Sequence, residues 1–407
     1  MNYKEAYEKL EKYGQLHVLK YYDELSEIEK GTLLKQIEEL DFGILKYSKE
    51  NTTNQKGEIS PLAAMQLPEI EEHRKRYTEI GVEEIRKGKV AAVLLAGGMG
   101  TRLGSDHPKG MFDIGLTRPV YIFQRIIENM LDVVRQAGAW VHLFVMTSDK
   151  NHDMTVAFFE EKGYFGYSKD YIRFFIQDVV PASDYEGNVY MEERWKIATS
   201  PNGNGGWFSS MNKCGLLNIV REDGIEWINV FAVDNVLQRI ADPCFVGATI
   251  DNGCVAGAKV VKKNSPDERV GALCLEDGRP SIVEYYELTD EMKMAKDADG
   301  NPAYDFGVIL NYIFKTQTLV EIMDRQLPLH VVEKQIPYMD DTGRHIEPDV
   351  PNGYKYETLV LDMIHQVDTC LAYEVEREKE FAPIKNATGI DSVETARELC
   401  KENGILL

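Results

Sequence analysis

A glycine-rich loop is the part of this sequence best suited to chemistry. An apolar run from Val90 to Ala96 is followed by residues 97–110, which read GGMGTRLGSDHPKG. Glycines let backbone N–H groups approach phosphate oxygens, and Arg102 and Lys109 add two positive charges within the same loop. The segment therefore predicts a binding loop for a polyphosphate, most simply a nucleoside triphosphate.

Two common phosphate loops do not fit this spacing. The dinucleotide fingerprint has a third glycine three residues after Gly100, but that position is Leu103, which disfavours an NAD-dependent oxidoreductase. A Walker A loop requires Gly-Lys-Ser/Thr, whereas Lys109 lies between Pro108 and Gly110. An ordinary strand-to-helix turn would explain the glycines but hardly the Arg and the Lys as well.

The loop resembles the signature of the uridylyltransferases that make UDP-sugars, and the chain is similar to the eukaryotic-type UDP-N-acetylhexosamine pyrophosphorylases. The likeness extends from about Val90 to about Arg397. It depends on an ordered series of further motifs at residues 145–148, 174–177, 201–206, 233–235, 257–261, 283–285, 334–338, 351–355 and 381–386. The resemblance implies that UTP and a sugar 1-phosphate give a UDP-sugar and pyrophosphate, by direct attack on the α-phosphorus.

The resemblance also implies roles for individual residues around the phosphates and the base. The cations expected to hold phosphates and act in catalysis are Arg102, Lys109, Lys355 and Lys385. The residues expected to contact the uridine nucleotide are Leu95, Ala96, Gly97, Gly98, Gln177 and Gly203. Asp234 is the expected ligand of Mg²⁺, the expected cofactor. Simpler interpretations stay open here: Asp234 as a helix cap, and Lys355 and Lys385 as solvated surface lysines.

The expected sugar contacts are Asn204, Gly271, Glu284, Tyr285 and Asp305. The sequence departs from the family at residues 304–308, which read YDFGV where the N-acetylhexosamine enzymes typically read FNAGN. Asp305 and Val308 thus replace two asparagines. We expect N-acetylglucosamine or N-acetylgalactosamine 1-phosphate as the substrate, with glucose or galactose 1-phosphate as the alternative. A non-catalytic regulator that binds UDP-sugar is the alternative of another class.

Composition limits the class of protein. The 407 residues are 43% hydrophobic, which supports a substantial buried core, and the net charge of −21 argues against nucleic acid as a partner. Apolar runs are strand-sized and the amino terminus is polar, so we expect a cytoplasmic protein without a membrane partner. Six scattered cysteines predict reduced thiols.

The arrangement of apolar runs predicts an α/β fold, Rossmann-like and, by resemblance, GT-A-like. A helical N-terminal region (1–88) carries a capping box at Ser26 and Glu29 and a polar loop at 51–60. In the catalytic domain (89–332), strands expected at 90–96, 141–146, 171–176 and 228–233 alternate with helices, which indicates a mixed, mainly parallel sheet. Ligands bind beyond the carboxyl ends of such strands. A small C-terminal region (333–407) follows.

Family members usually carry a further C-terminal domain after the segment matched by Thr395-Ala396-Arg397, whereas this sequence ends at Leu407. On that ground we expect a monomer.

Overall fold

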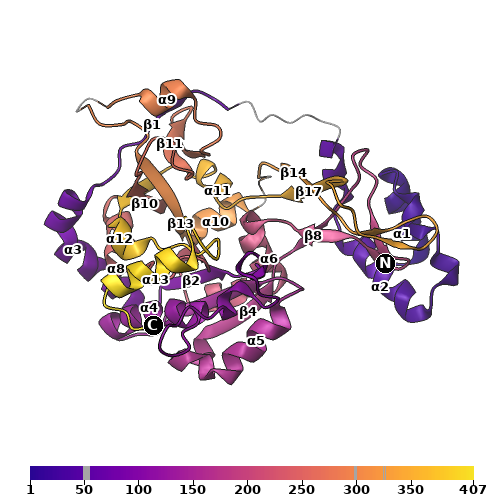
Figure 1. Ribbon diagram of the computed structural model, residues 1–407, viewed down its shortest axis with the longest axis horizontal. Coiled ribbons are helices and arrows are strands. Elements are labelled where there is room, and N and C mark those ends of the chain that lie inside the picture. The colour runs from indigo at the N-terminus through magenta and orange to yellow at the C-terminus, as the bar shows by residue number, and fades with distance from the viewer. Residues whose placement is uncertain (49–55, 298–299, 324, 326) are drawn as a thin grey trace. The chain divides into compact units, whose positions relative to one another are not determined.

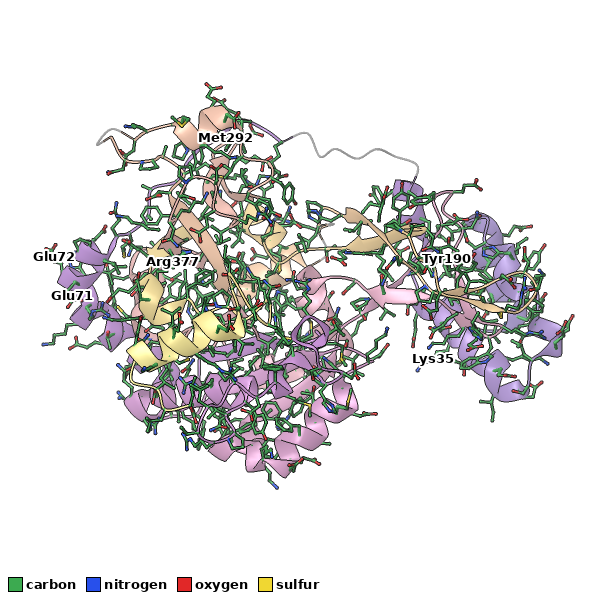
Figure 2. All side chains as sticks on the ribbon, in the orientation of Figure 1. Lys35, Glu71, Glu72, Tyr190, Met292 and Arg377 are labelled. Atoms are coloured by element: carbon green, nitrogen blue, oxygen red, sulfur yellow. The ribbon has the colours of Figure 1, made fainter. Side chains whose placement is uncertain are left out.

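The computed structural model describes residues 1–48, 56–297, 300–323, 325 and 327–407, and the chain forms two compact units (Figure 1). The first unit consists of Met1–Gln55, Asp178–Gly206 and Leu327–Leu359. The second consists of Lys56–Gln177, Trp207–Gln326 and Val360–Leu407. In both units, side chains fill the space between the elements, while Glu71 and Glu72 point outward into solvent (Figure 2).

A ten-stranded mixed sheet forms the core of the second unit. Its main path runs β1-β11-β13-β9-β2-β3-β4, with β12 beside β11 and with β10 and β18 beyond β13. The strands are β1 Ile59–Pro61, β2 Val90–Leu95, β3 His142–Thr147, β4 Ile172–Ile176, β9 Trp227–Ala232, β10 Ala256–Lys262, β11 Ala272–Glu276, β12 Arg279–Val283, β13 Phe306–Lys315 and β18 Cys370–Glu374. Strands β9, β2, β3 and β4 are parallel, and β13 is antiparallel to β9. The carboxyl ends of the four parallel strands therefore share one edge with the amino end of β13.

Helices supply the rest of this core. All six residues of β2 are buried, and alternate ones (Val90, Ala92 and Leu94) share one apolar cluster with α4 residues such as Phe123 and Met130. A strand buried on both faces is typical of a parallel sheet between helices. The helices are α3 Leu67–Arg86, α4 Ile122–Ala137, α5 His152–Glu161, α6 Trp207–Lys213, α7 Leu217–Glu222, α8 Pro243–Asp251, α9 Asp290–Met294, α10 Thr316–Ile322, α11 Asp362–His365, α12 Arg377–Glu380 and α13 Val393–Glu402.

The first unit has its own core. Leu10, Leu33 and Ile37 of its helices pack with Ile197 and Tyr356 of its strands. The helices are α1 Tyr3–Lys12 and α2 Glu27–Glu39, with 3₁₀ turns at Leu16–Leu19, Tyr22–Glu24 and Phe42–Ser48. The strands are β5 Val179–Pro181, β6 Met191–Glu193, β7 Lys196–Ile197, β8 Thr199–Pro201, β14 His330–Lys334, β15 Tyr338–Met339, β16 His345–Ile346 and β17 Gly353–Glu357.

The α/β class and the mixed sheet are confirmed, and the four expected strands are β2, β3, β4 and β9. The linear division at residues 88 and 332 does not coincide with the two units. Two later segments, 178–206 and 327–359, pack on the N-terminal helices, whereas α3 belongs to the second unit. The loop expected at 51–60 falls partly outside the described residues, and its end enters strand β1. The capping box is present: the Ser26 N–H donates to Glu29 Oε2 over 2.8 Å.

No helix in the described ranges is long and apolar enough to cross a membrane. The six cysteines are free thiols, as expected.

Helices α3 and α8 approach each other closely at Gly81 of α3 and Gly247 of α8. This contact can be tested by substitution. A Cβ atom on Gly81 would lie 1.9 Å from the Pro243 carbonyl oxygen. We expect Gly81→Ala to lower the free energy of unfolding by about 1–3 kcal/mol, since the backbone must shift. Gly31→Ala is the control because that exposed glycine inside α2 has no neighbouring atom within 4 Å, so alanine should raise stability. Urea midpoints measure both. A Gly81→Ala protein as stable as wild type would contradict the packing.

Candidate active site

The glycine loop follows β2 and closes on itself. The Gly100 N–H donates to the His107 carbonyl over 2.8 Å, and the Lys109 N–H donates to the Gly98 carbonyl over 3.1 Å. Arg102 lies in a 3₁₀ turn at Thr101–Leu103, which ends at Gly104 with a left-handed φ of 74°. Lys109 begins a second 3₁₀ turn at Lys109–Met111. The two cations are therefore presented by one closed loop at the carboxyl end of β2.

Residues beyond β3 hold the carbonyl groups of this loop. The buried Asn151 side chain donates from Nδ2 to the Ala96 carbonyl over 2.9 Å, and Ser148 Oγ donates to the Gly97 carbonyl over 2.9 Å. The N–H groups of Gly97 and Gly98 make no hydrogen bond to any described residue. Two successive N–H groups without a protein acceptor can donate to an anion. Asn151 was not predicted as a site residue; the Thr147-Ser148 motif just before it was the nearest signal.

Gln177 lies beside the loop, as expected for a residue that follows β4. Its backbone N–H donates to the Thr147 carbonyl over 2.8 Å, and its side chain is buried. A Cβ atom on Gly97 would lie only 2.3 Å from Gln177 Oε1, so glycine at this position makes room for the amide. The amide offers a donor and an acceptor, which is the pattern needed to recognise the imide edge of uracil. Leu95 and Ala96 are buried in the strand end that supports this contact.

Three cations and Asp234 gather at this edge. Lys109 Nζ lies 3.8 Å from Asp234 Oδ2. Burial lowers the pKa of Lys109; the charge of Asp234 opposes this shift, whereas the positive charges of Arg102 and Lys385 add to it. Arg102 is exposed and makes no hydrogen bond or ion pair within the described part of the chain. The cluster thus has more positive than negative charge in a protein whose net charge is −21, which favours a bound polyanion.

The fold brings the segment of Lys385 next to Asp234, although 150 residues lie between them in the sequence. The Ile384 N–H donates to the Asp234 carbonyl over 2.9 Å. Lys385 Nζ lies 3.0 Å from Asp391 Oδ2, a partner that the sequence did not reveal. The interpretation of Asp234 as a helix cap is not supported, because the N-cap of α8 is Asp242, which accepts the Cys244 N–H over 3.1 Å.

Four of the residues expected to contact the sugar flank strands of the large sheet: Gly271 directly precedes β11, Glu284 and Tyr285 directly follow β12, and Asp305 directly precedes β13. The Val308 N–H donates to the Gly271 carbonyl over 2.9 Å, and a Cβ atom on Gly271 would lie 3.5 Å from Glu284 Oε2. Tyr285 is 39% exposed. The Asp305 carbonyl accepts the N–H of Lys263, and burial raises the pKa of the Asp305 carboxyl despite nearby lysines. Gly271, Glu284 and Val308 therefore form one group.

Gly203, Asn204 and Lys355 belong to the first unit. Gly203 has a left-handed φ of 84°, and a Cβ atom there would lie 2.2 Å from the Thr358 carbonyl oxygen. Asn204 begins a 3₁₀ turn at Asn204–Gly206, and Lys355 pairs with Val332 across β17 and β14. Glycine is thus required at 203 by both its backbone conformation and its neighbour.

Asp234 is the candidate metal ligand at the cation cluster, because Asp391 pairs with Lys385. No group of three or more His, Cys, Asp and Glu side chains converges among the residues described. Mg²⁺ is commonly held by one or two carboxylates together with substrate phosphates, rather than by a cage of protein ligands. The Asp234 carboxylate, 24% exposed at the end of β9, fits that pattern.

This loop, the cation cluster and the sheet define a nucleotide-binding α/β protein, and comparison with known proteins gives its family. The model of the family described as UTP–glucose-1-phosphate uridylyltransferase matches residues 42–402. The chain belongs to this family.

Relatives cover most of the chain. It is 35% identical to the human "UDP-N-acetylhexosamine pyrophosphorylase-like protein 1", over 96% of this chain and 82% of that protein. It is 35% identical to the "UDP-N-acetylglucosamine pyrophosphorylase" of Saccharomyces cerevisiae, over 94% and 86% of the two chains. The fold is similar to the crystal structure of the uridine diphosphate N-acetylglucosamine pyrophosphorylase from Trypanosoma brucei, with a TM-score of 0.83, 29% identity and coverage of 96% and 83%.

The free guanidinium of Arg102 gives a test of the anion site. We expect Arg102→Ala to weaken binding of inorganic tripolyphosphate by about tenfold or more, because a hydrogen bond to a charged group contributes about 1.5 kcal/mol or more. Its thermal midpoint should not change, since the side chain has no partner to lose. Arg135→Ala, which removes an exposed cation paired with Asp132 on α4, is the matched control. Equal affinities for all three proteins in calorimetry would contradict the site.

Proposed function

We propose that the chain is a uridylyltransferase that converts UTP and a sugar 1-phosphate into a UDP-sugar and pyrophosphate. The observation that carries this proposal is the cluster of Arg102, Lys109 and Lys385 beside the free N–H groups of the glycine loop. Family membership and relatives named as UDP-N-acetylglucosamine pyrophosphorylases support the same reaction. The central sheet with its ligand edge supports a GT-A-like nucleotidyltransferase arrangement.

The reaction requires positioning and charge stabilisation rather than a base. The oxygen of a sugar phosphate is already an anion near neutral pH, so it can attack the α-phosphorus directly while pyrophosphate leaves with the bonding electron pair. Arg102 and Lys109 orient the triphosphate and stabilise the charge that moves onto pyrophosphate, and Lys385 adds a third positive charge to the same phosphates. Gln177 and the Gly98 backbone recognise uracil.

Asp234 is the residue that would hold Mg²⁺. The ion, when bound, would neutralise phosphate charge that three cations leave uncompensated. Lys109 lies beside the same carboxylate, so it keeps Asp234 oriented toward the phosphates.

The sugar is proposed to lie near Glu284 and Gly271, with N-acetylglucosamine or N-acetylgalactosamine 1-phosphate as the substrate. Val308 favours the second candidate, a hexose 1-phosphate, because valine lacks the amide that an asparagine would offer to an acetamido group. The roles of Gly203, Asn204, Tyr285, Asp305 and Lys355, a monomeric state and a cytoplasmic location stay predictions. A non-catalytic regulator is disfavoured by the presence of the phosphate cations.

An exchange assay tests the reaction. With Mg²⁺ present, we expect radiolabelled pyrophosphate to enter UTP when the protein is given UDP-N-acetylglucosamine or UDP-N-acetylgalactosamine, and far more slowly with UDP-glucose or UDP-galactose. Excess EDTA should abolish the exchange. The reverse order of sugars would favour the hexose alternative, and exchange that survives chelation would contradict the role of Mg²⁺. No labelled UTP with any of the four would overturn the function.

The lowered pKa of Lys109 predicts that the reaction slows at alkaline pH. The protonated amine is the form that binds phosphate, so kcat/KM should fall as pH rises through a pKa below the ordinary 10.5 of lysine. Lys109→Arg keeps its charge at these pH values and should move the fall to higher pH, even though its rate is lower. Ionisation of pyrophosphate and uracil affects both proteins equally. The shift between the pH profiles of kcat/KM for the wild type and for Lys109→Arg therefore reports the titration of Lys109. Coincident profiles would contradict the assignment.

A further inference from the structure

Asn235, directly after Asp234, joins the Asp234 loop to the segment that leads to Lys385. Its side chain is 1% exposed. Oδ1 accepts the N–H of Ala382 over 2.9 Å, and Nδ2 donates to the carbonyl of Glu380 over 2.7 Å. An amide can accept on one side and donate on the other, which neither a carboxylate nor an apolar side chain of this size can do. The Asn235 side chain therefore satisfies a carbonyl at one end of the 380–382 segment and an N–H at the other.

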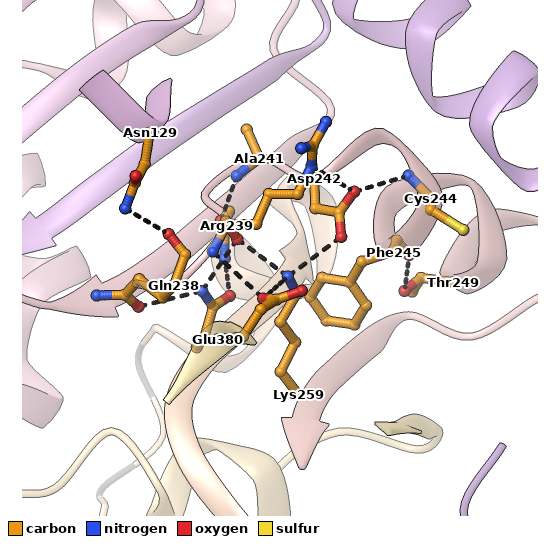
Figure 3. A network of polar contacts seen from close by, with 12 residues as sticks. Asn129, Gln238, Arg239, Ala241, Asp242, Cys244, Phe245, Thr249, Lys259 and Glu380 are labelled. Atoms are coloured by element: carbon orange, nitrogen blue, oxygen red, sulfur yellow. Dashed lines mark hydrogen bonds and ion pairs between the residues drawn. The ribbon is translucent and has the colours of Figure 1, made fainter. Parts of the chain in front are cut away.

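A buried ion pair with Lys259 also holds the Glu380 side chain in place. The fully buried Lys259 lies with Nζ 2.5 Å from Glu380 Oε2 and 3.2 Å from Asp242 Oδ2 (Figure 3). The backbone N–H of Arg239 also donates to Glu380 Oε2, over 3.2 Å. Buried charges held by several partners are costly to displace. The carbonyl that Asn235 binds thus belongs to a residue with little freedom to move.

Backbone contacts extend this link to the phosphate site. The Val236 N–H donates to the Ala382 carbonyl over 3.3 Å, and the Ile384 N–H donates to the Asp234 carbonyl over 2.9 Å. Lys385 is the next residue. The loop that carries Asp234 and the segment that carries Lys385 consequently form one short paired structure, and Asn235 is the side chain that ties its two halves together.

We infer that Asn235 is a positioning residue for the transfer reaction: it holds Asp234 and Lys385 at a fixed separation, so that both face the same triphosphate. This inference rests on the proposed function. Asn235 itself lies beneath the site and acts through its neighbours. The physical reason for an effect on rate is that displacement of a catalytic group by about 1 Å can cost about a hundredfold.

Two substitutions at this position and one matched control separate positioning from stability. Asn235→Ala removes all side-chain bonds, whereas Asn235→Asp keeps the shape and the acceptor but places a carboxylate against the Glu380 carbonyl. Asn129→Ala is the control, because the hydrogen bonds of Asn129 go to the Val236 and Gln238 carbonyls of the same loop and to Arg125, rather than to the 380–385 segment. We expect both Asn235 variants to lower kcat by about thirtyfold or more, with KM for UTP changed less. Asn129→Ala should lower the thermal midpoint similarly but kcat by less than about threefold.

A double-mutant cycle with Lys385→Met gives the decisive measurement. If Asn235 acts by placing Lys385, then Asn235→Ala should cost less than about threefold in kcat when Lys385 is already methionine. Equal costs in both backgrounds, or an Asn129→Ala protein that loses as much kcat as Asn235→Ala, would overturn the inference. A wild-type protein without exchange activity is a different outcome, because it would overturn the proposed function on which this inference rests.

Discussion

Positive charge held close together at one edge of the sheet is the constraint on which the rest of this structure depends. Lys109, Arg102 and Lys385 repel one another; burial lowers the pKa of Lys109, and the charges of Arg102 and Lys385 lower it further. Such an arrangement is unfavourable in the empty protein and becomes favourable when a polyanion enters. The scaffold must therefore hold the cations in place against their own repulsion.

Two kinds of restraint provide this. The glycine loop is tied to the end of β3 through its carbonyl groups, which leaves the N–H groups of Gly97 and Gly98 for a ligand. Lys385 is held by Asp391 and by the contacts of its segment with the Asp234 loop. The first restraint uses carbonyl acceptors, which carry no net charge, and the second uses one carboxylate, Asp391. The cations are therefore held in place while the cluster keeps an excess of positive charge.

Sequence predicted the parts of this arrangement that are local. Apolar runs identified β2, β3, β4 and β9, because a buried parallel strand is continuous and hydrophobic, and the glycines with Arg102 and Lys109 identified the loop between them. Contacts between distant segments had no such signal. Asn151 and Asp391 are ordinary polar residues until the fold brings them to the Gly97 loop and to Lys385. The two units were hidden for the same reason, because nothing local shows that residues 178–206 and 327–359 pack on the N-terminal helices.

The sugar side differs from the phosphate side in a way that explains why its specificity is harder to derive. A phosphate is recognised by full charges and free backbone donors, and few alternative ligands satisfy such a set. At β13, the Val308 N–H already donates to the Gly271 carbonyl, so this N–H is not available to a ligand. Under the proposed function, discrimination between sugars would come from side-chain contacts to neutral hydroxyl and acetamido groups of the ligand, for example from the Glu284 carboxylate, and water can replace such contacts. Under the proposed function, valine at position 308 in place of the family's asparagine therefore bears on the choice of sugar and leaves the phosphate cations Arg102 and Lys109 unchanged.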